Sequence, residues 1–317
     1  MATPTRVALA LGGGGARGYA HIGVIEILEE RGFEVVGLAG SSMGAVIGGL
    51  YAAGRLESYT EWVRSLTSRD VVRLLDPAFR AAGAIRAEKV LDRVRELLGD
   101  TLIEDLPIPF TAVATDLLAQ KPVWFQSGPM DVAIRASIAL PTVITPVVLN
   151  GRILVDGGVV DPVPITPMTS VDADLTVAVS LSGAPVGTQG PPATESTHER
   201  PRSEWLERAY RATAQVLDTD AVKSLWARFG SGDDEEGEPN GEEDLLPELG
   251  MTDVINLSID AMQAVITRYR MGGSPPDLLI TIPKNTCGTL DFHHAEGTIA
   301  VGRTKTEEAL DTAGLTA

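Results

Sequence analysis

The chain opens with two short apolar segments, VALALG (7–12) and EVVGLAG (34–40), which both end in glycine and enclose a helical segment (20–32). This alternation predicts a βαβ unit, and βαβ units build parallel sheets covered by helices. Further strands are expected at 108–117, 122–126, 152–156, 174–181 and 277–282. Further helices are expected at 44–54, 87–98, 130–139, 204–229, 252–271 and 304–313. The pattern restricts the chain to an α/β fold.

Four consecutive glycines follow the first strand, and GGGARG (13–18) matches G-x-G-x-x-G between a strand and a helix. This spacing is typical of dinucleotide sites, which also need an acidic residue at the end of the second strand to bind the ribose. Here the second strand ends in GLAG (37–40). The missing acid disfavours a nucleotide-dependent oxidoreductase. A loop of bare amides also suits the oxyanion of an ester under attack.

A nucleophile is expected directly after the second strand. GSSMG (40–44) has the form G-x-S-x-G and leads into an apolar helix, which is the arrangement of a nucleophile elbow centred on Ser42. The N-terminus of that helix favours negative charge near the serine oxygen. Both the elbow and the glycine loop follow parallel strands, so we expect them to meet at one edge of the sheet.

The proton acceptor for Ser42 is less obvious. The apolar strand RILVD ends in Asp156, and two glycines follow, so a tight turn would hold this carboxylate at the sheet edge. His293 and His294 leave open a Ser–Asp–His triad or, with Asp291, a metal cluster. We expect His21 to be a packing or capping residue of the first helix. We expect Cys287 to be a small buried side chain.

Taken together, the motifs at 13–18, 40–44 and 156–158 resemble, in this order, the three signatures of patatin-like phospholipases. Segments between the serine and the aspartate are similar to the core of that family, and PPDLLITI (275–282) is similar to a late strand of its bacterial members. The resemblance covers residues 6–182 closely and the remainder loosely.

The resemblance implies a three-layer α/β/α sandwich with a central, mostly parallel sheet. It implies hydrolysis of lipid acyl esters by a Ser–Asp dyad, without metal or cofactor. Ser42 would be the nucleophile and Asp156 the general base and then the acid. The oxyanion hole would be formed by the amides of Gly13, Gly14 and Gly15. Arg17 would either support this loop or face a polar head group.

The charge of the chain limits its partners. Nine of the acidic residues behind the net charge of −17 lie at 230–250, where there is no lysine or arginine. No basic stripe suits nucleic acid, and we expect no such partner. A single cysteine, no secretory signal and no long apolar run predict a cytoplasmic protein. The resemblance implies a lipid or phospholipid substrate. Membrane contact would be peripheral, through Trp205 and Trp226 of the 204–229 helix, with a core role for these two side chains as an equal alternative.

Three regions are expected along the chain. Residues 6–182 form the catalytic core, 183–250 form a flexible insertion with one amphipathic helix and the acidic tract, and 251–317 complete the same domain. The insertion is longer and more acidic than a minimal family member needs. A catalytically weak regulatory or binding protein, with the acidic tract as its interaction surface, is the alternative function. The sequence leaves the oligomeric state open.

Overall fold

A computed structural model describes residues 3–67, 69–71, 88–141, 143–184 and 251–316. Met1–Val186 and Ile259–Ala317 form one compact unit, and Gly187–Ser258 form a second. The predicted helix at 204–229 and the acidic tract lie outside the described residues, as does almost all of the proposed insertion. No helix among the described residues is long and apolar enough to cross a membrane.

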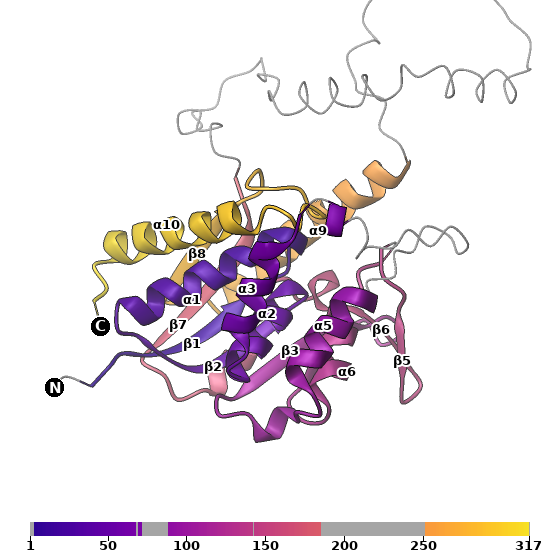
Figure 1. Ribbon diagram of the computed structural model, residues 1–317, viewed down its shortest axis with the longest axis horizontal. Helices are drawn as coiled ribbons and strands as arrows, with labels where there is room; N and C mark the ends of the chain where they lie inside the picture. The colour runs from indigo at the N-terminus through magenta and orange to yellow at the C-terminus, as the bar shows by residue number, and fades with distance from the viewer. Residues whose placement is uncertain (1–2, 68, 72–87, 142, 185–250, 317) are drawn as a thin grey trace, which may run out of the picture. The chain divides into compact units, whose positions relative to one another are not determined.

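The described residues form one mixed sheet of eight strands (Figure 1). The strands are β1 (Arg6–Leu11), β2 (Glu34–Ser41), β3 (Phe110–Asp116), β4 (Lys121–Phe125), β5 (Val147–Leu149), β6 (Arg152–Asp156), β7 (Leu175–Gly183) and β8 (Leu278–Pro283). Their order is β5-β6-β3-β2-β1-β7-β8, and β4 also pairs with β3. The strands β3, β2, β1, β7 and β8 are parallel, whereas β4, β5 and β6 run antiparallel to their neighbours. The predicted mostly parallel sheet is therefore confirmed.

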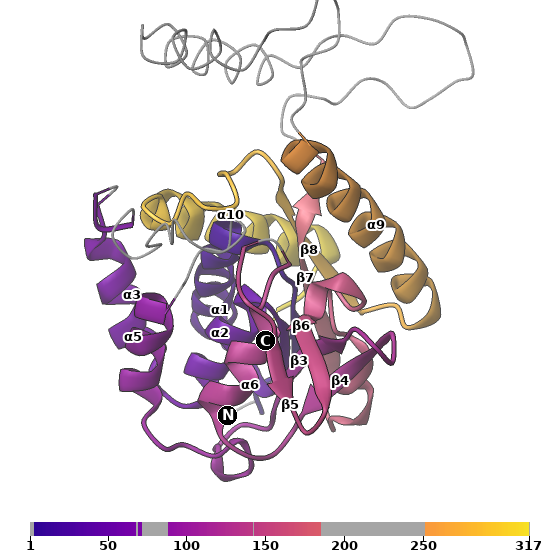
Figure 2. The same cartoon turned by 90° about the vertical axis from the view of Figure 1, so that its right-hand side faces the viewer.

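Helices lie on both faces of this sheet. They are α1 (Ala20–Glu30), α2 (Met43–Ala52), α3 (Leu56–Ser65), α5 (Glu88–Leu98), α6 (Met130–Ser137), α9 (Met251–Gly273) and α10 (Ala295–Ala313). Figure 2 shows α1, α2 and α10 on one face and α9 on the other. The structure differs from the sequence predictions at three elements: α3 and β5 were not predicted, and α10 begins nine residues before residue 304.

Strand β1 explains why the two faces are covered differently. Its alternate residues Val7, Leu9 and Leu11 belong to the large core under α1, α2 and α10. The residues between them, Ala8 and Ala10, face a smaller apolar cluster that includes residues of the segment 163–171 and of α9. Small side chains let that segment lie close to the sheet. Residues 7–11 of β1 are buried on both sides and form a continuous apolar run, as expected for the centre of a parallel sheet.

Helices α1 and α10 approach each other closely because each carries a glycine at the contact. A Cβ atom on Gly23 would lie 2.1 Å from the Ile299 carbonyl oxygen, and one on Gly302 would lie 2.1 Å from that of Ala20. Neither position can therefore accept a side chain without moving a helix.

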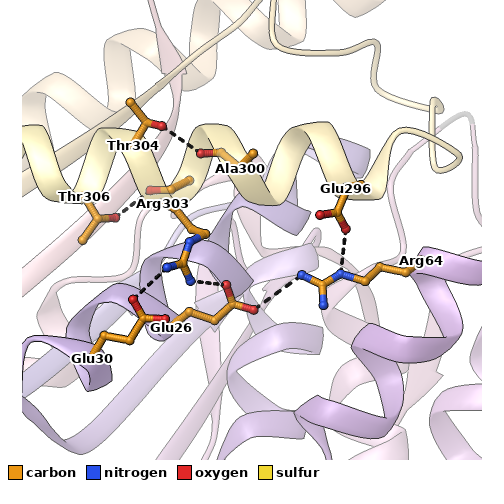
Figure 3. Close-up of polar contacts among 9 residues, drawn as sticks. Glu26, Glu30, Arg64, Glu296, Ala300, Arg303, Thr304 and Thr306 are labelled. Carbon is orange, nitrogen blue, oxygen red and sulfur yellow. Dashed lines mark hydrogen bonds and ion pairs between the residues drawn. The ribbon is translucent and has the colours of Figure 1, made fainter.

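An ion-pair network follows the same helix contact (Figure 3). Arg303 of α10 reaches Glu26 and Glu30 of α1, each at 2.7 Å. Arg64 of α3 is 2.8 Å from Glu296 and 3.8 Å from Glu26. Ion pairs this exposed add little to stability, because solvent screens their charges. The close packing, rather than these charges, must therefore supply most of the stability of this contact.

Candidate active site

The ends of two strands meet on β3, and this brings the two predicted catalytic residues together. Strand β2 runs parallel to β3 until Ser41 pairs with Val113. Strand β6 runs antiparallel to β3 and ends where Asp156 pairs with Ala114. Since β4 occupies the other edge of β3 along residues 112–116, β2 and β6 must share one edge, end to end. Val113 and Ala114, which are neighbours on β3, thus pair with Ser41 and Asp156 respectively. Ser41 directly precedes Ser42.

Ser42 has the backbone conformation of a strained elbow. It lies between β2 and α2 with φ 55° and ψ −125°, in a region that residues with side chains rarely adopt. The turn is tight enough that a Cβ on Gly40 would lie 2.3 Å from Gly44, and a Cβ on Gly44 would lie 2.1 Å from the Leu11 carbonyl oxygen. Both glycines of the G-x-S-x-G motif are therefore required by close backbone approach.

A buried serine of α6 holds this strained backbone in place. The Ser42 amide donates to the Ser137 hydroxyl oxygen at 3.0 Å, and that hydroxyl donates to the Val113 carbonyl at 2.6 Å. Ser137 thus links the elbow to the strand on which β2 and β6 meet. No pattern in the sequence singled out Ser137, because its role depends on a contact between residues far apart in the chain.

The backbone and one carboxylate oxygen of Asp156 are fixed by neighbouring groups. Its amide donates to the Ala139 carbonyl at 2.9 Å, and its carbonyl accepts from the Thr115 hydroxyl at 2.9 Å. Oδ1 accepts from the Gly158 amide at 2.7 Å. Gly157 has no room for a side chain, because a Cβ would lie 2.1 Å from the Val113 carbonyl oxygen. Only Oδ2 is left to react.

Burial changes the acidity of Asp156, which is 2% exposed. It raises the pKa of this carboxyl group to about 6, against hydrogen bonding from Ser42 and Gly158, which lowers the pKa. Oδ2 has no hydrogen-bond partner of ordinary geometry among the described residues. The Ser42 hydroxyl is nevertheless close enough to the carboxyl group to lower its pKa. Catalytic hydrogen bonds are often long until substrate binds.

The glycine loop lies against the elbow, since a Cβ on Gly13 would be 3.1 Å from the Ser42 Cβ. The Gly13 amide, however, donates to the Pro162 carbonyl at 3.0 Å, so in this structure it is not free for an oxyanion and differs from the prediction. The amides of Gly14 and Gly15 donate to none of the described residues. Met43, the first residue of α2, likewise has an amide without an acceptor within the helix.

The segment between β8 and α10 supports the glycine loop from outside. The Ala16 amide donates to the Thr289 carbonyl at 2.9 Å. Arg17 donates to the carbonyls of Gly14 and Lys284, both at 3.2 Å. Arg17 therefore makes the loop-supporting contacts that were one of its two predicted roles. The sequence did not indicate the contribution of residues 284–289, because it consists of main-chain carbonyls, which any residue type could supply.

His21 of α1 holds the start of the same loop. Its Nε2 lies 2.7 Å from the Gly12 carbonyl oxygen, and this side chain is fully buried. Because burial lowers the pKa of His21 to about 4, the ring is neutral at physiological pH and must carry its proton on Nε2 to donate. The expectation of a packing residue thus holds, with an added contact to the loop.

The other candidates form no hydrogen bond with Asp156 in the described part of the chain. No hydrogen bond joins His293 or His294 to Asp156, and their rings lie against each other with centroids 4.1 Å apart. Asp291 accepts from the Gly288 amide at 2.8 Å, and no group of three or more ligand side chains in the described part of the chain could hold a metal ion. Cys287 is partly buried, 3.6 Å from the Thr298 hydroxyl.

Comparisons with known proteins show which family the chain resembles along most of its length. A family model described as patatin-like phospholipase matches residues 9–169. An NTE family protein of Mycobacterium tuberculosis is 49% identical over 96% of this chain and 91% of its own length. Human patatin-like phospholipase domain-containing protein 6 is 34% identical over 56% of this chain and 14% of its own. Lysophospholipase NTE1 of Mycosarcoma maydis is 36% identical over 55% of this chain and 10% of its own.

Proposed function

The chain belongs to the patatin-like phospholipase family, a family of lipid hydrolases, and on this premise we propose that it hydrolyses lipid acyl esters with Ser42 as nucleophile and Asp156 as general base. The proposal rests on one observation: β2 and β6 end at neighbouring positions of β3, next to a loop in which the amides of Gly14 and Gly15 donate to none of the described residues. This arrangement supplies a nucleophile, a base and an oxyanion site at one point.

In the first half of the reaction, Ser42 Oγ attacks the ester carbonyl carbon and its proton moves to Asp156 Oδ2. The raised pKa of Asp156 makes the carboxylate a better proton acceptor while leaving it ionised near neutral pH. The oxyanion is stabilised by the amides of Gly14, Gly15 and Met43. The bond to the alcohol then breaks, and the leaving oxygen takes the proton from Asp156.

In the second half, Asp156 takes a proton from water, and the resulting hydroxide attacks the acyl-enzyme. The bond between the acyl carbon and Ser42 Oγ breaks, and Asp156 returns its proton to Ser42. The products are a fatty acid and an alcohol. Neither half of the reaction needs a histidine. Replacement of a histidine should therefore leave a Ser–Asp dyad active, whereas it would inactivate a Ser–Asp–His triad.

The dyad is tested with a short-chain p-nitrophenyl ester and with a fluorophosphonate probe. We expect Ser42→Ala and Asp156→Asn to abolish hydrolysis, and the probe to label Ser42 of the wild type. The matched controls His293→Ala and His294→Ala should retain activity. Loss of activity in a folded histidine variant would favour the triad, and absence of labelling of the folded wild type would count against an enzyme.

The substrate class is proposed from the family. One relative is named a lysophospholipase and another a phospholipase domain-containing protein, so we propose phospholipids and lysophospholipids as substrates. We further propose a cytoplasmic location with peripheral contact with membranes. Fatty acid release from a panel of lipids, measured beside Ser42→Ala, identifies the preferred head group. Equal release by both proteins would show that the lipid hydrolysis comes from a contaminant.

A further inference from the structure

Residues 156–162 form the base turn, which carries the proposed general base and contacts the two other parts of the site. The Asp161 carbonyl accepts from the Ser41 hydroxyl at 2.6 Å, directly before the nucleophile. The Pro162 carbonyl accepts from the Gly13 amide at 3.0 Å, in the glycine loop. The base turn therefore sets the spacing between base, elbow and loop.

A side chain of helix α9 also contacts the base turn. Arg270 of α9 donates through Nε to the Val160 carbonyl at 3.0 Å, and its Nη1 lies 3.2 Å from Asp161 Oδ2. Three consecutive carbonyls, 160 to 162, thus each bind a different part of the molecule. Arg270 is the only arginine or lysine for which an ion pair with Asp161 is found among the described residues.

Burial of the charged Asp161 side chain is unfavourable, and the charge of Arg270 offsets this only in part. Asp161 is 0% exposed, and neither carboxylate oxygen has a well-aligned hydrogen bond within the described part of the chain. Burial raises the pKa of Asp161 to about 6, and the charge of Arg270 opposes this rise. Buried ion pairs add little to stability compared with apolar residues of similar size, but they can fix one arrangement. The Arg270–Asp161 pair is therefore better explained by a role in fixing the geometry of the base turn than by a gain in stability.

We propose that Arg270, acting through Asp161 and the Val160 carbonyl, is a positioning residue that aligns the base turn with the nucleophile and the glycine loop. The inference rests on the proposed function. Arg270 touches none of the reacting atoms, so its loss should misplace the base without removing any catalytic group. A displacement of about 1 Å at a reacting centre can cost roughly a hundredfold in rate.

The test compares Arg270→Gln, Asp161→Asn and the double variant with wild type on a soluble p-nitrophenyl ester. We expect Arg270→Gln to lower kcat roughly tenfold to a hundredfold with KM within about twofold, and to slow fluorophosphonate labelling of Ser42 by a similar factor. The double variant has no unpaired buried charge, so its melting temperature should be higher than that of Arg270→Gln. Its kcat should stay as low as that of Arg270→Gln. That difference separates positioning from stability.

Arg303→Gln is the matched control, since Arg303 also pairs with carboxylates from another helix and its side chain is 34% exposed against 30% for Arg270. It should lose stability and keep kcat. If Arg270→Gln does not fold, Arg270→Lys keeps the charge but cannot reach both acceptors, so it should show an intermediate kcat. Wild-type kcat in the folded Arg270 and Asp161 variants would overturn the inference while leaving the proposed function standing. An inactive, unlabelled wild type would instead overturn both.

Discussion

At Ser42 the backbone adopts a conformation that is unfavourable for a residue with a side chain, and its neighbours hold it there. Among the described residues, two other non-glycine residues have positive φ: Gln120 and Asn150 lie in the turns after β3 and β5, where such values are ordinary. Ser42 lies instead between a buried strand and a helix. Strain of this kind costs about 1 to 3 kcal/mol and is retained where it presents a reactive group.

Ser137 is the residue on which this conformation most directly depends. Ser137→Ala removes the acceptor of the Ser42 amide and the donor to Val113, so we expect a loss of about 1 to 3 kcal/mol in unfolding free energy. Because the elbow is released, kcat should also fall. Thr306→Ala, which removes a buried hydroxyl within α10, is the control and should lose stability only. Equal kcat in all three proteins, measured by ester hydrolysis, would contradict this role.

The burial of Asp156 should make the unfolding free energy of the protein depend on pH. The pKa of Asp156 is about 6 in the folded protein against an ordinary value of 3.8, so between these values the folded state binds more protons and stability falls as pH rises. Asp156→Asn removes this penalty. We expect it to raise the unfolding free energy by about 3 kcal/mol at pH 8 and by little at pH 4, as measured by urea unfolding. An equal effect at both pH values would rule out a raised pKa.

At the scale of elements, the site depends on how strands and helices approach each other. Strand β3 is the template on which β2 and β6 end, and α1 supports the glycine loop through His21. The position of α1 is in turn fixed by α10 through Gly23 and Gly302. A change in the helix contact should therefore alter stability first and the site second.

Two glycines of α10 should respond in opposite ways to the same substitution. Gly302→Ala places a methyl group 2.1 Å from the Ala20 carbonyl oxygen, and we expect it to destabilise the fold by about 1 to 3 kcal/mol. A Cβ on Gly297 would have no atom within 4 Å, so Gly297→Ala should stabilise the helix by up to about 1 kcal/mol. Thermal unfolding measures both. The same sign for both variants would contradict the close approach of α1 and α10.

At the scale of the whole molecule, the layers on both sides of the sheet create the low-polarity surroundings of the dyad. Asp156 is almost fully buried where its backbone contacts Thr115 of β3 and Ala139, and this desolvation is the main cause of its raised pKa. The same assembly brings residues from near both ends of the described chain, Ala16 and Thr289, into contact at the glycine loop.

An acid limb in the pH profile of activity should follow from this burial. Since only ionised Asp156 can accept the Ser42 proton, kcat/KM should fall below about pH 6, by roughly tenfold per pH unit if one proton is responsible. A neutral ester assayed from pH 4.5 to 8 gives the profile, and circular dichroism at each pH excludes unfolding. Constant kcat/KM from pH 5 to 8 would contradict Asp156 as the base.

Local sequence patterns determined which elements form and which residues are the candidates for catalysis. The alternation of apolar runs and helices predicted seven of the eight described strands, and the glycine, serine and aspartate motifs supplied the candidate dyad. Strand β5 was missed although Asn150 and Gly151, both with positive φ, are a recognisable hairpin signal. These features are readable because secondary-structure periodicity, turn residues and motif spacing are properties of neighbouring residues.

Tertiary structure alone decided how the motifs meet. The antiparallel pairing of β6 with β3, the bond from Gly13 to Pro162 and the reach of Arg270 to the base turn all join residues far apart in the chain. Such contacts follow from the simultaneous packing of all layers, and main-chain carbonyls and amides can take part whatever the residue type. For that reason no local pattern in the sequence specifies them.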